Sequence, residues 1–318
     1  MKYILSLFIL SFLISCQNQK NTISINSEKL LLNLKAIAHD STEGRFFGTE
    51  GNKKTQIYLA KEFEKLGAIP AFENNYIQEY PYTFKGKRRQ RIYPIANPNE
   101  DFSNVPDTTV IGGNVAAYLK GKTDKTIVIT GHLDHLGIRN DKIYNGADDD
   151  ASGTAALLAM VEYFKNKQMK HSLVFAAVDA EEIGSLGADY LLKNFPMDTA
   201  KIAMNINMDM IAHSDSTIYA SGLYHYPKLK KPLDDLNTHL VLKYGHDDPN
   251  NDDLDDWTNS SDHRIFHRAG IPFIYFGVED HKDYHKHTDT FETINQEFYV
   301  DAVEMIIQAI ENYDAFLD

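Results

Sequence analysis

The hydrophobic pattern of the chain alternates between two periods, which predict strands and helices in turn. Short runs that are mostly apolar predict strands, and those apolar on both faces, such as 126–130 and 173–178, belong inside a sheet covered by helices. Such runs occur at residues 115–119, 126–130, 172–178, 202–208 and 271–277. Longer segments with apolar residues at helical spacing predict helices at residues 27–38, 53–66, 153–165, 187–193, 262–269 and 296–316, with a further helix near 233–242. Strands that alternate with helices in this way predict an α/β fold.

This alternation favours a three-layer sandwich, in which helices cover a central, mostly parallel β-sheet with mixed edges. The hydrophobic fraction of 43% over 318 residues is enough for a large core, which excludes disorder as the dominant state. Residues 76–82 and 91–95 flank the basic turn 85–89, and we interpret them as an edge hairpin whose charges discourage edge pairing. No repeat or internal linker divides the chain after residue 26, so residues 27–318 are expected to form one domain.

The first residues resemble a bacterial lipoprotein signal. The apolar run 3–14 is too short to span a bilayer as a helix, and it ends at Leu13-Ile14-Ser15-Cys16. The resemblance implies that residues 1–15 are removed and that Cys16 carries the lipid, with the polar segment 16–26 as a tether. The alternative is an ordinary secretory signal with a chance cysteine. Both interpretations predict export, and a lipid anchor would place the protein in the bacterial cell envelope, periplasmic or surface-facing.

Charge and cysteine content narrow the function. The formal net charge is -13, which argues against nucleic acid as a partner because phosphates need a positive surface. Cys16 is the only cysteine, so the chain can form neither an intrachain disulfide nor a thiolate-rich zinc site. The 13 histidines, together with the surplus of carboxylates, make a metal site of imidazole and carboxylate ligands worth testing.

Histidine, aspartate and glutamate gather directly after the predicted strands, where an α/β sheet forms its ligand site. These segments are Gly131-His132-Leu133-Asp134-His135, Asn145-Gly146-Ala147-Asp148-Asp149-Asp150, Asp179-Ala180-Glu181-Glu182, Asp209, and Asp283-Tyr284-His285-Lys286-His287. Two divalent cations about 3.5–4 Å apart need a carboxylate that reaches both and further His and carboxylate ligands for each. Such ligands favour two Zn²⁺ ions, and Mn²⁺ or Co²⁺ also fits them.

Two pairs of neighbouring residues suggest roles around these ions. His132 and Asp134 share a strand face, so the Asp134 carboxylate is expected to accept the second ring N–H of His132. Glu181 and Glu182 are adjacent and diverge, so that one can bind a metal while the other acts as a general base.

Taken in order, these motifs resemble the zinc aminopeptidase family of the secreted bacterial leucyl aminopeptidases. That family also contains glutamate carboxypeptidase II, transferrin receptor and, by fold, glutaminyl cyclase. The motifs are His132-Leu-Asp134, Gly146-Ala-Asp-Asp-Asp-Ala-Ser-Gly153, Ala180-Glu-Glu182, Asn207-Met-Asp-Met-Ile211, Ser261-Asp-His263 before Ala269-Gly-Ile-Pro272, and Tyr284-His-x-x-x-Asp-Thr290. The resemblance spans residues 27–318, including Glu43-Gly-Arg45 and Asn114-Val115, and implies a zinc exopeptidase fold.

The resemblance also implies a role for each residue. His132 and Asp209 would complete the shell of one metal, Glu182 and His285 would complete the other, and Asp148 would bridge both. Asp149 would follow Asp148 through a cis peptide and support the site. Glu181 would be the general base. Tyr284 matches a tyrosine that polarises the scissile carbonyl in some members, and a packing role fits it equally well.

We therefore expect a membrane-tethered aminopeptidase that hydrolyses N-terminal residues from peptides. The alternatives are a glutaminyl-peptide cyclase, which needs one zinc ion, and a non-catalytic binding lipoprotein, which would be expected to lack ligands. His135, His281 and His287 are weaker candidates as ligands, with His287 at the rim or in solvent. Asp262 and His263 are expected to hold a loop and a helix together. The acidic segment 247–256 could bind a cationic substrate terminus or calcium, and a solvated surface loop is the favoured interpretation.

Overall fold

A mixed β-sheet forms the centre of the computed structural model, which describes residues 23–86 and 106–318. Within these residues the sheet has nine strands. Their order across the sheet is β1 (Ile69–Pro70), β3 (Thr108–Leu119), β7 (Ser172–Val178), β4 (Thr126–His132), β8 (Ile202–Met208), β11 (Phe273–Gly277), β9 (Thr217–Ser221) and β10 (Val241–Lys243), while β2 (Ile77–Phe84) also pairs with β3. The four central strands β7, β4, β8 and β11 run parallel, and β3 and β9 are antiparallel to their central neighbours. The carboxyl ends of the four parallel strands therefore meet at one edge of the sheet.

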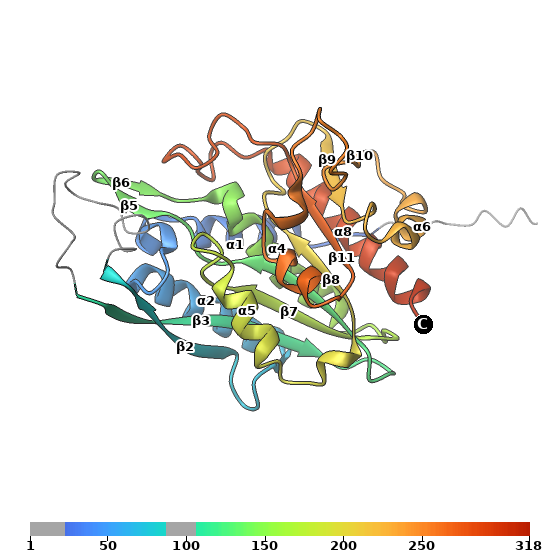
Figure 1. Cartoon of the computed structure of the whole chain (residues 1–318), viewed down its shortest axis with the longest axis horizontal. Helices are drawn as coiled ribbons and strands as arrows, with labels where there is room; N and C mark the ends of the chain where they lie inside the picture. Colours follow the sequence, from blue (N-terminus) through green and yellow to red (C-terminus); the bar gives the residue numbers. More distant parts are fainter. Residues whose placement is uncertain (1–22, 87–105) are drawn as a thin grey trace, which may run out of the picture.

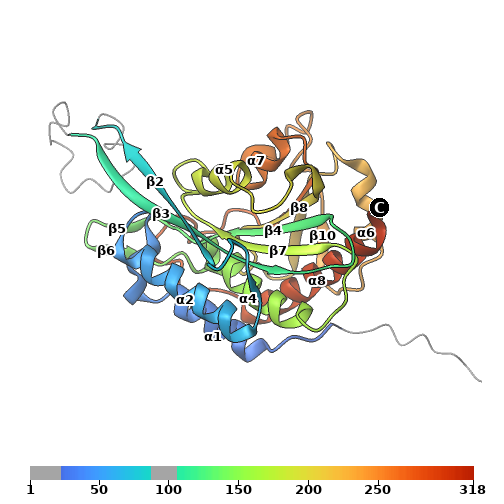
Figure 2. The same ribbon diagram turned by 90° about the horizontal axis from the view of Figure 1, so that it is seen from below.

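Helices cover both faces of this sheet (Figures 1 and 2). One face is covered by α1 (Ser27–Ile37), α2 (Glu50–Leu66), α4 (Gly153–Phe164) and α8 (Gln296–Phe316), and the other by α5 (Leu186–Lys193) and α7 (His263–Arg268). Alternate side chains of β4 face opposite layers, so Ile127 and Ile129 join the larger core cluster while Val128 joins the smaller one. The expected three-layer α/β sandwich is confirmed.

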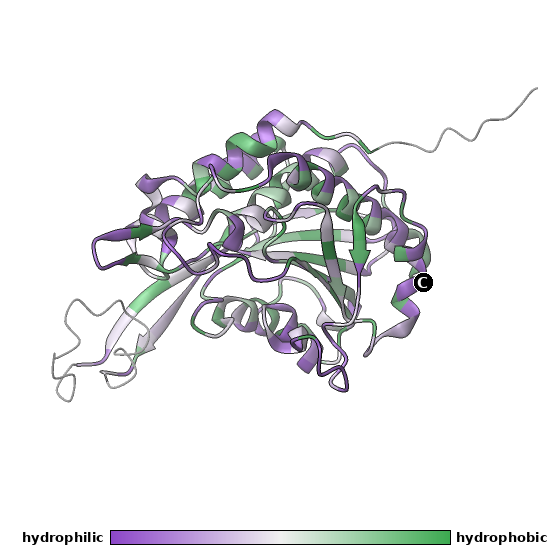
Figure 3. Cartoon of the chain, turned by 90° about the horizontal axis from the view of Figure 1, so that it is seen from above, coloured by the Kyte–Doolittle hydropathy of each residue, from purple (hydrophilic) through white to green (hydrophobic). Residues whose placement is uncertain are grey.

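Shorter elements connect these layers. They are the hairpin β5 (Gly137–Arg139) and β6 (Lys142–Tyr144), the helix α6 (Lys230–Asp234), and the helical turns η1 (Asp40–Arg45), η3 (Ala147–Ser152), η4 (Thr199–Lys201), η5 (Pro227–Leu229) and η6 (Trp257–Asn259). Figure 3 shows hydrophobic colouring concentrated in the central strands and hydrophilic colouring along the outer loops. Among the described residues, no helix has the length and apolar character needed to cross a bilayer.

One sequence-based expectation about local structure is wrong, and another falls partly outside the described residues. The segment 233–242 is not one helix, because α6 ends at Asp234 and Val241 begins strand β10, which pairs with β9. The expected hairpin of 76–82 with 91–95 stays a prediction, and the described part of it shows β2 paired antiparallel with β3, from Ile77 opposite Val115 to Phe84 opposite Thr108. Residues 91–95 lie outside the described residues, as do residues 1–22 with the predicted signal and Cys16.

The side chain of Arg45 is fully buried and connects the loops beneath the site through hydrogen bonds. The Arg45 guanidinium donates hydrogen bonds to the carbonyl oxygens of Leu133, Ile37, Asn145 and Gly146 at 2.5–3.1 Å. Burial lowers the pKa of Arg45 to about 10, although four nearby aspartates favour its charged form. The side chain thus connects the segments on which His132 and Asp149 are held.

We expect Arg45→Met to lower the free energy of unfolding by about 3–5 kcal/mol, because it leaves buried carbonyl groups and carboxylates without their partner. Urea denaturation would measure the change. Arg268→Met is the matched control, since Arg268 is exposed and its side chain donates to Asn259 Oδ1. We expect the control to change stability by less than about 0.5 kcal/mol. Equal stability of Arg45→Met and wild type would show that the hydrogen bonds of Arg45 do not stabilise the fold.

Candidate metal centre

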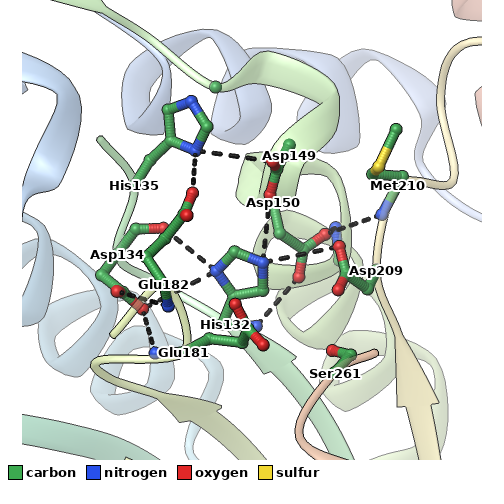
Figure 4. Close-up of polar contacts among 12 residues, drawn as sticks. His132, Asp134, His135, Asp149, Asp150, Glu181, Glu182, Asp209, Met210 and Ser261 are labelled. Atoms are coloured by element: carbon green, nitrogen blue, oxygen red, sulfur yellow. Dashed lines mark hydrogen bonds and ion pairs between the residues drawn. The ribbon is translucent and has the colours of Figure 1, made fainter. Parts of the chain in front are cut away.

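The carboxyl ends of the central strands bring the predicted acidic and imidazole side chains together (Figure 4). His132 is the last residue of β4, and Asp209 follows β8 directly. Glu181 and Glu182 lie in the loop after β7, and His285 lies in the loop after β11. The side chains of His132, Asp209 and Glu182 are at least 89% buried, whereas His285 is 41% exposed. The site is therefore closed towards the sheet and open on the side of His285.

Three of these residues form a first group. His132 Nε2 lies 3.1 Å from Asp149 Oδ1 and 3.4 Å from Asp209 Oδ1. Ligand atoms of the three side chains lie close enough together to surround one metal ion. The first group thus contains one imidazole and two carboxylates, a donor set that suits zinc with a coordination position left open.

A second group, of Asp149, Glu182 and His285, shares Asp149 with the first, and His135 lies against it. His285 Nε2 lies 3.1 Å from Asp149 Oδ2 and 3.5 Å from Glu182 Oε2. On the other side, His135 Nδ1 lies 2.7 Å from Glu182 Oε1 and 3.7 Å from Asp149 Oδ2. Each oxygen of Asp149 therefore faces a different group. Burial disfavours ionisation of Asp149, but His135, His132 and His285 together hold the pKa of this carboxyl well below its usual range.

The shared carboxylate is Asp149, and the expected bridging position of Asp148 is therefore corrected by one residue. Asp148 points away from both groups, with Oδ1 accepting the N–H of Ala212 and Oδ2 lying 3.1 Å from His281 Nε2. Asp150 turns elsewhere again and accepts the N–H groups of His132 and Gly153.

The cis peptide bond joins Asp149 to Asp150 and not Asp148 to Asp149. Asp149 itself lies inside the site, within 3.1 Å of both His132 Nε2 and His285 Nε2, so its expected supporting role is also corrected. Three consecutive aspartates cannot be told apart by residue type, because only the backbone path through η3 decides which carboxylate faces the site.

Asp134 supports the site in a different way from the one expected. His132 Nδ1 lies 3.1 Å from the backbone carbonyl oxygen of Asp134, whereas the Asp134 carboxylate is 3.7 Å away. That carboxylate instead accepts the backbone N–H groups of Glu181 and Glu182, at 3.0 and 3.3 Å. Asp134 therefore positions the two glutamates. Its adjacent carbonyl oxygen can accept the His132 ring proton, which leaves Nε2 free for a metal.

Glu181 lies beside these groups without joining either of them. It lines the same cleft as His132, Asp149 and Asp209. Burial raises the pKa of Glu181 well above its usual value, and the nearby carboxylates of Asp262, Asp209 and Glu182 raise it further, while His132 opposes the shift. A carboxyl with a raised pKa is better matched to proton transfer near neutral pH than an exposed glutamate.

The cleft over the groups has a volume of about 580 Å³ and contains residues that the sequence did not single out as functional. Those that line it include Trp257, Arg264, Tyr275 and Asp280. Of the acidic segment 247–256, the lining includes Asp255, whereas Asp247 is buried and accepts the N–H groups of Gly222 and Tyr224. Tyr284 also lines the cleft, and its ring stacks on His285 with 4.0 Å between centroids.

A third cluster, of His213, His281 and Asp283, lies near Asp148. The rings of His213 and His281 are stacked 3.7 Å apart with 15° between their planes. The lone pairs of two nearly parallel imidazoles do not converge on one ion, so we interpret this cluster as packing. His287 is partly exposed, its Nε2 lies 2.8 Å from Lys142 Nζ, and it is not among the residues that line the cleft.

The curated proteins that are similar to this chain match it over about 60% of its length, and two of them carry different names. The "Alkaline phosphatase isozyme conversion protein" of Escherichia coli (strain K12) is 27% identical over 64% of this chain and 56% of its own length. "Leucine aminopeptidase 1" of Ajellomyces capsulatus (strain NAm1 / WU24) is 26% identical over 63% of this chain and 47% of its own length. The chain thus spans about half the length of the curated relatives it matches.

Solved structures with the same fold are more distant in sequence. An aminopeptidase from Aneurinibacillus sp. strain AM-1 superposes with a TM-score of 0.70 at 16% identity, covering 92% of this chain and 94% of that one. The glutaminyl cyclase of Bacteroides thetaiotaomicron superposes with a TM-score of 0.67 at 17% identity, covering 92% of this chain and 99% of that one.

The model of peptidase family M28 matches residues 114–310, more than half of the chain and every residue of both groups. The chain belongs to peptidase family M28.

Proposed function

We propose that this protein is a metal-dependent aminopeptidase with two cation positions. The observation that carries the proposal is the position of Asp149, whose two carboxylate oxygens face two separate groups of His and acidic side chains. His132, Asp149 and Asp209 would hold one ion, and Asp149, Glu182 and His285 would hold the other. Glu181, in the same cleft but outside both groups, is then free to act as the base.

The donor atoms fit divalent cations. Imidazole nitrogens and carboxylate oxygens lie 3.1–3.5 Å apart, and Oε1 of Glu182 is buried with no hydrogen-bond partner in the described part of the chain. A group of this kind is costly unless an ion or water satisfies it. Zn²⁺ suits these ligands best, and Mn²⁺ or Co²⁺ is an alternative. When bound, the ions would polarise a peptide carbonyl and lower the pKa of a water molecule.

Glu181 would move the proton. Its carboxylate would take a proton from the attacking water and return it to the leaving amine, so one residue acts as base and then as acid. The Asp134 carboxylate holds the Glu181 backbone through the bond to its N–H, which fixes the distance between the base and the two groups. The remaining side chains of the cleft would bind and orient the peptide.

The charge of the cleft favours the amino end of a peptide. Besides the proposed ligands and base, Asp255 and Asp280 line it, and Arg264 is the only lysine or arginine among the described lining residues. An N-terminal ammonium group is attracted to such a surface, whereas a C-terminal carboxylate is repelled. Peptides with a free N-terminus are therefore the proposed substrates.

Glutaminyl-peptide cyclisation is the rival reaction, and fold similarity does not choose between the two because an aminopeptidase and a glutaminyl cyclase superpose with similar TM-scores, 0.70 and 0.67. The presence of two groups favours hydrolysis, since a one-metal cyclase needs only one of them. The test is to purify the protein, measure bound metal, and assay aminoacyl-anilides beside N-terminal glutaminyl peptides. We expect two ions per chain and release of the anilide. One zinc ion per chain with cyclisation and no hydrolysis would overturn the proposal.

Tyr284 provides a separate test of carbonyl polarisation. We expect Tyr284→Phe to lower kcat about 100-fold with little change in KM, because the hydroxyl would donate to the oxygen that gains charge in the transition state. Phenylalanine keeps the ring that stacks on His285, so packing is preserved. Steady-state kinetics on a leucyl anilide measures the effect. An unchanged kcat would assign Tyr284 to packing alone.

We also propose that Cys16 anchors the exported protein to a membrane of the bacterial envelope. The support is the sequence pattern before Cys16 alone, since this part lies outside the described residues. Cells expressing the full chain should incorporate labelled palmitate into it, and Cys16→Ser should abolish incorporation and release the protein from membranes. Labelling that persists in Cys16→Ser would exclude Cys16 as the lipid site.

A further inference from the structure

His135 is buried in an environment that does not satisfy its ring. The side chain is fully buried, and neither Nδ1 nor Nε2 has a hydrogen-bond partner within residues 23–86 and 106–318. Leaving a buried polar atom unpaired is destabilising, so such atoms in folded proteins usually face a water or an ion. A group that can satisfy the ring nitrogens of His135 is therefore expected close to them.

The nearest group is a second unsatisfied atom. His135 Nδ1 and Glu182 Oε1 are 2.7 Å apart, yet neither of them forms a hydrogen bond. Their distance is short enough for one, so the ring is oriented wrongly for donation along this line. Two atoms that carry lone pairs and approach in this way are satisfied together by a cation that both of them contact.

Asp149 and His285 complete the surroundings of this position. Asp149 Oδ2 lies 3.7 Å from His135 Nδ1 and 3.1 Å from His285 Nε2. The two oxygens of Glu182 face different histidines, Oε1 towards His135 and Oε2 towards His285 at 3.5 Å. The imidazole rings approach from different sides, with centroids 6.0 Å apart and 55° between their planes. His135 forms the inner wall of the position and His285 the outer wall.

The backbone keeps the His135 ring in place. A Cβ added at Gly146 would lie 2.5 Å from the ring carbons of His135 and 2.0 Å from the Asp149 carbonyl oxygen. Gly146 also has φ +54°, a conformation that side chains rarely adopt. The glycine thus allows the loop carrying Asp149 to close directly over His135, which brings both residues to Glu182.

We propose that His135 is a fourth protein ligand of the second cation, beside Asp149, Glu182 and His285. This inference rests on the metal positions of the proposed function. The first cation then has three protein ligands and the second has four. Since closed four-ligand sites hold zinc more firmly than sites with an open position, the second position should bind its ion more tightly and the first should exchange.

The test measures metal binding and not turnover. Metal-free full-length protein is titrated with Co²⁺ while its visible absorption is recorded, and Zn²⁺ affinity is measured by competition with a chromophoric chelator. We expect two classes of site in the wild type. His135→Ala should weaken the tighter class more than about 100-fold, beyond the usual loss for a residue that merely supports a ligand, and should change its Co²⁺ spectrum.

Two further variants separate binding from positioning. In His135→Asn the amide N–H can reach the place of Nδ1 and donate to Glu182, whereas the amide oxygen is a poorer ligand for Zn²⁺ or Co²⁺ than an imidazole nitrogen. We expect this variant to resemble His135→Ala, and its size preserves the test if the alanine variant fails to fold. His287→Ala is the matched histidine control and should leave both classes unchanged, because His287 belongs to neither group.

Restoration of wild-type affinity and spectrum by His135→Asn would overturn the ligand assignment and make His135 a positioning residue. Unchanged affinities in His135→Ala would overturn it as well. The proposed function would survive both results, since it depends on two bound ions and on Glu181. Wild-type protein that binds no ion at all would instead overturn the proposed function.

Discussion

Replacing Glu181 by glutamine is expected to lower kcat by about 10²–10⁴-fold while both metal ions stay bound. Glutamine keeps the size of the side chain and removes its ability to accept a proton, which is the contribution assigned to a general base. The bonds from the Asp134 carboxylate to the backbone N–H groups of Glu181 and Glu182 do not involve the replaced group. The second ligand group should therefore keep its geometry.

Steady-state kinetics on aminoacyl-anilides and metal analysis of the same samples would measure these effects. Glu297→Gln is the control for the change of charge, because Glu297 is exposed at the start of α8. It should keep full activity. Normal turnover in Glu181→Gln would remove Glu181 from the mechanism, and loss of metal from this variant would place Glu181 among the ligands.

Replacing Asp149 by asparagine is expected to remove both metal ions together and to abolish activity. Asp149 is the only residue that the two groups of the described site share, so its carboxylate balances the charge at both positions. Loss of a direct ligand should weaken each position more than the 10- to 100-fold typical of supporting residues. No other single substitution in the site is expected to empty both positions.

Asp148→Asn is the matched comparison, one residue away and equally buried. Asp148 contacts Ala212 and His281 and neither group, so this variant should keep both ions after dialysis. Metal content per chain, measured on the two variants in parallel, decides between the two aspartates. Two ions retained by Asp149→Asn and lost by Asp148→Asn would restore Asp148 to the bridging position.

Local patterns were sufficient for the elements with the strongest periodicity. Strands β7 and β8 and helix α8 have the predicted bounds, because continuous apolar runs and a long amphipathic stripe are properties of neighbouring residues. Pattern alone misassigned residues 233–242, where Val241 pairs with β9. That pairing depends on a partner 24 residues away in sequence, from Val241 to Thr217.

The site shows the same division. The residue types and their places after the strands predicted that His132, Glu182, Asp209 and His285 would meet, since parallel strands end at one edge. The choice among Asp148, Asp149 and Asp150 could not be made in this way. Nor could the contact of His135 with Glu182, because no motif marks a histidine whose ring becomes buried by a loop closing over it.

The sequence by itself determined the fold class, the family and the edge of the sheet where the chemistry lies, because these follow from periodicity and from residue order along the chain. The tertiary structure alone decided which oxygen faces which nitrogen. The path of the backbone through η3 directs Asp149 between the two groups, and Gly146 lets that loop close over His135. Directions of side chains depend on backbone dihedral angles and on distant neighbours, and neither is contained in the spacing of residue types.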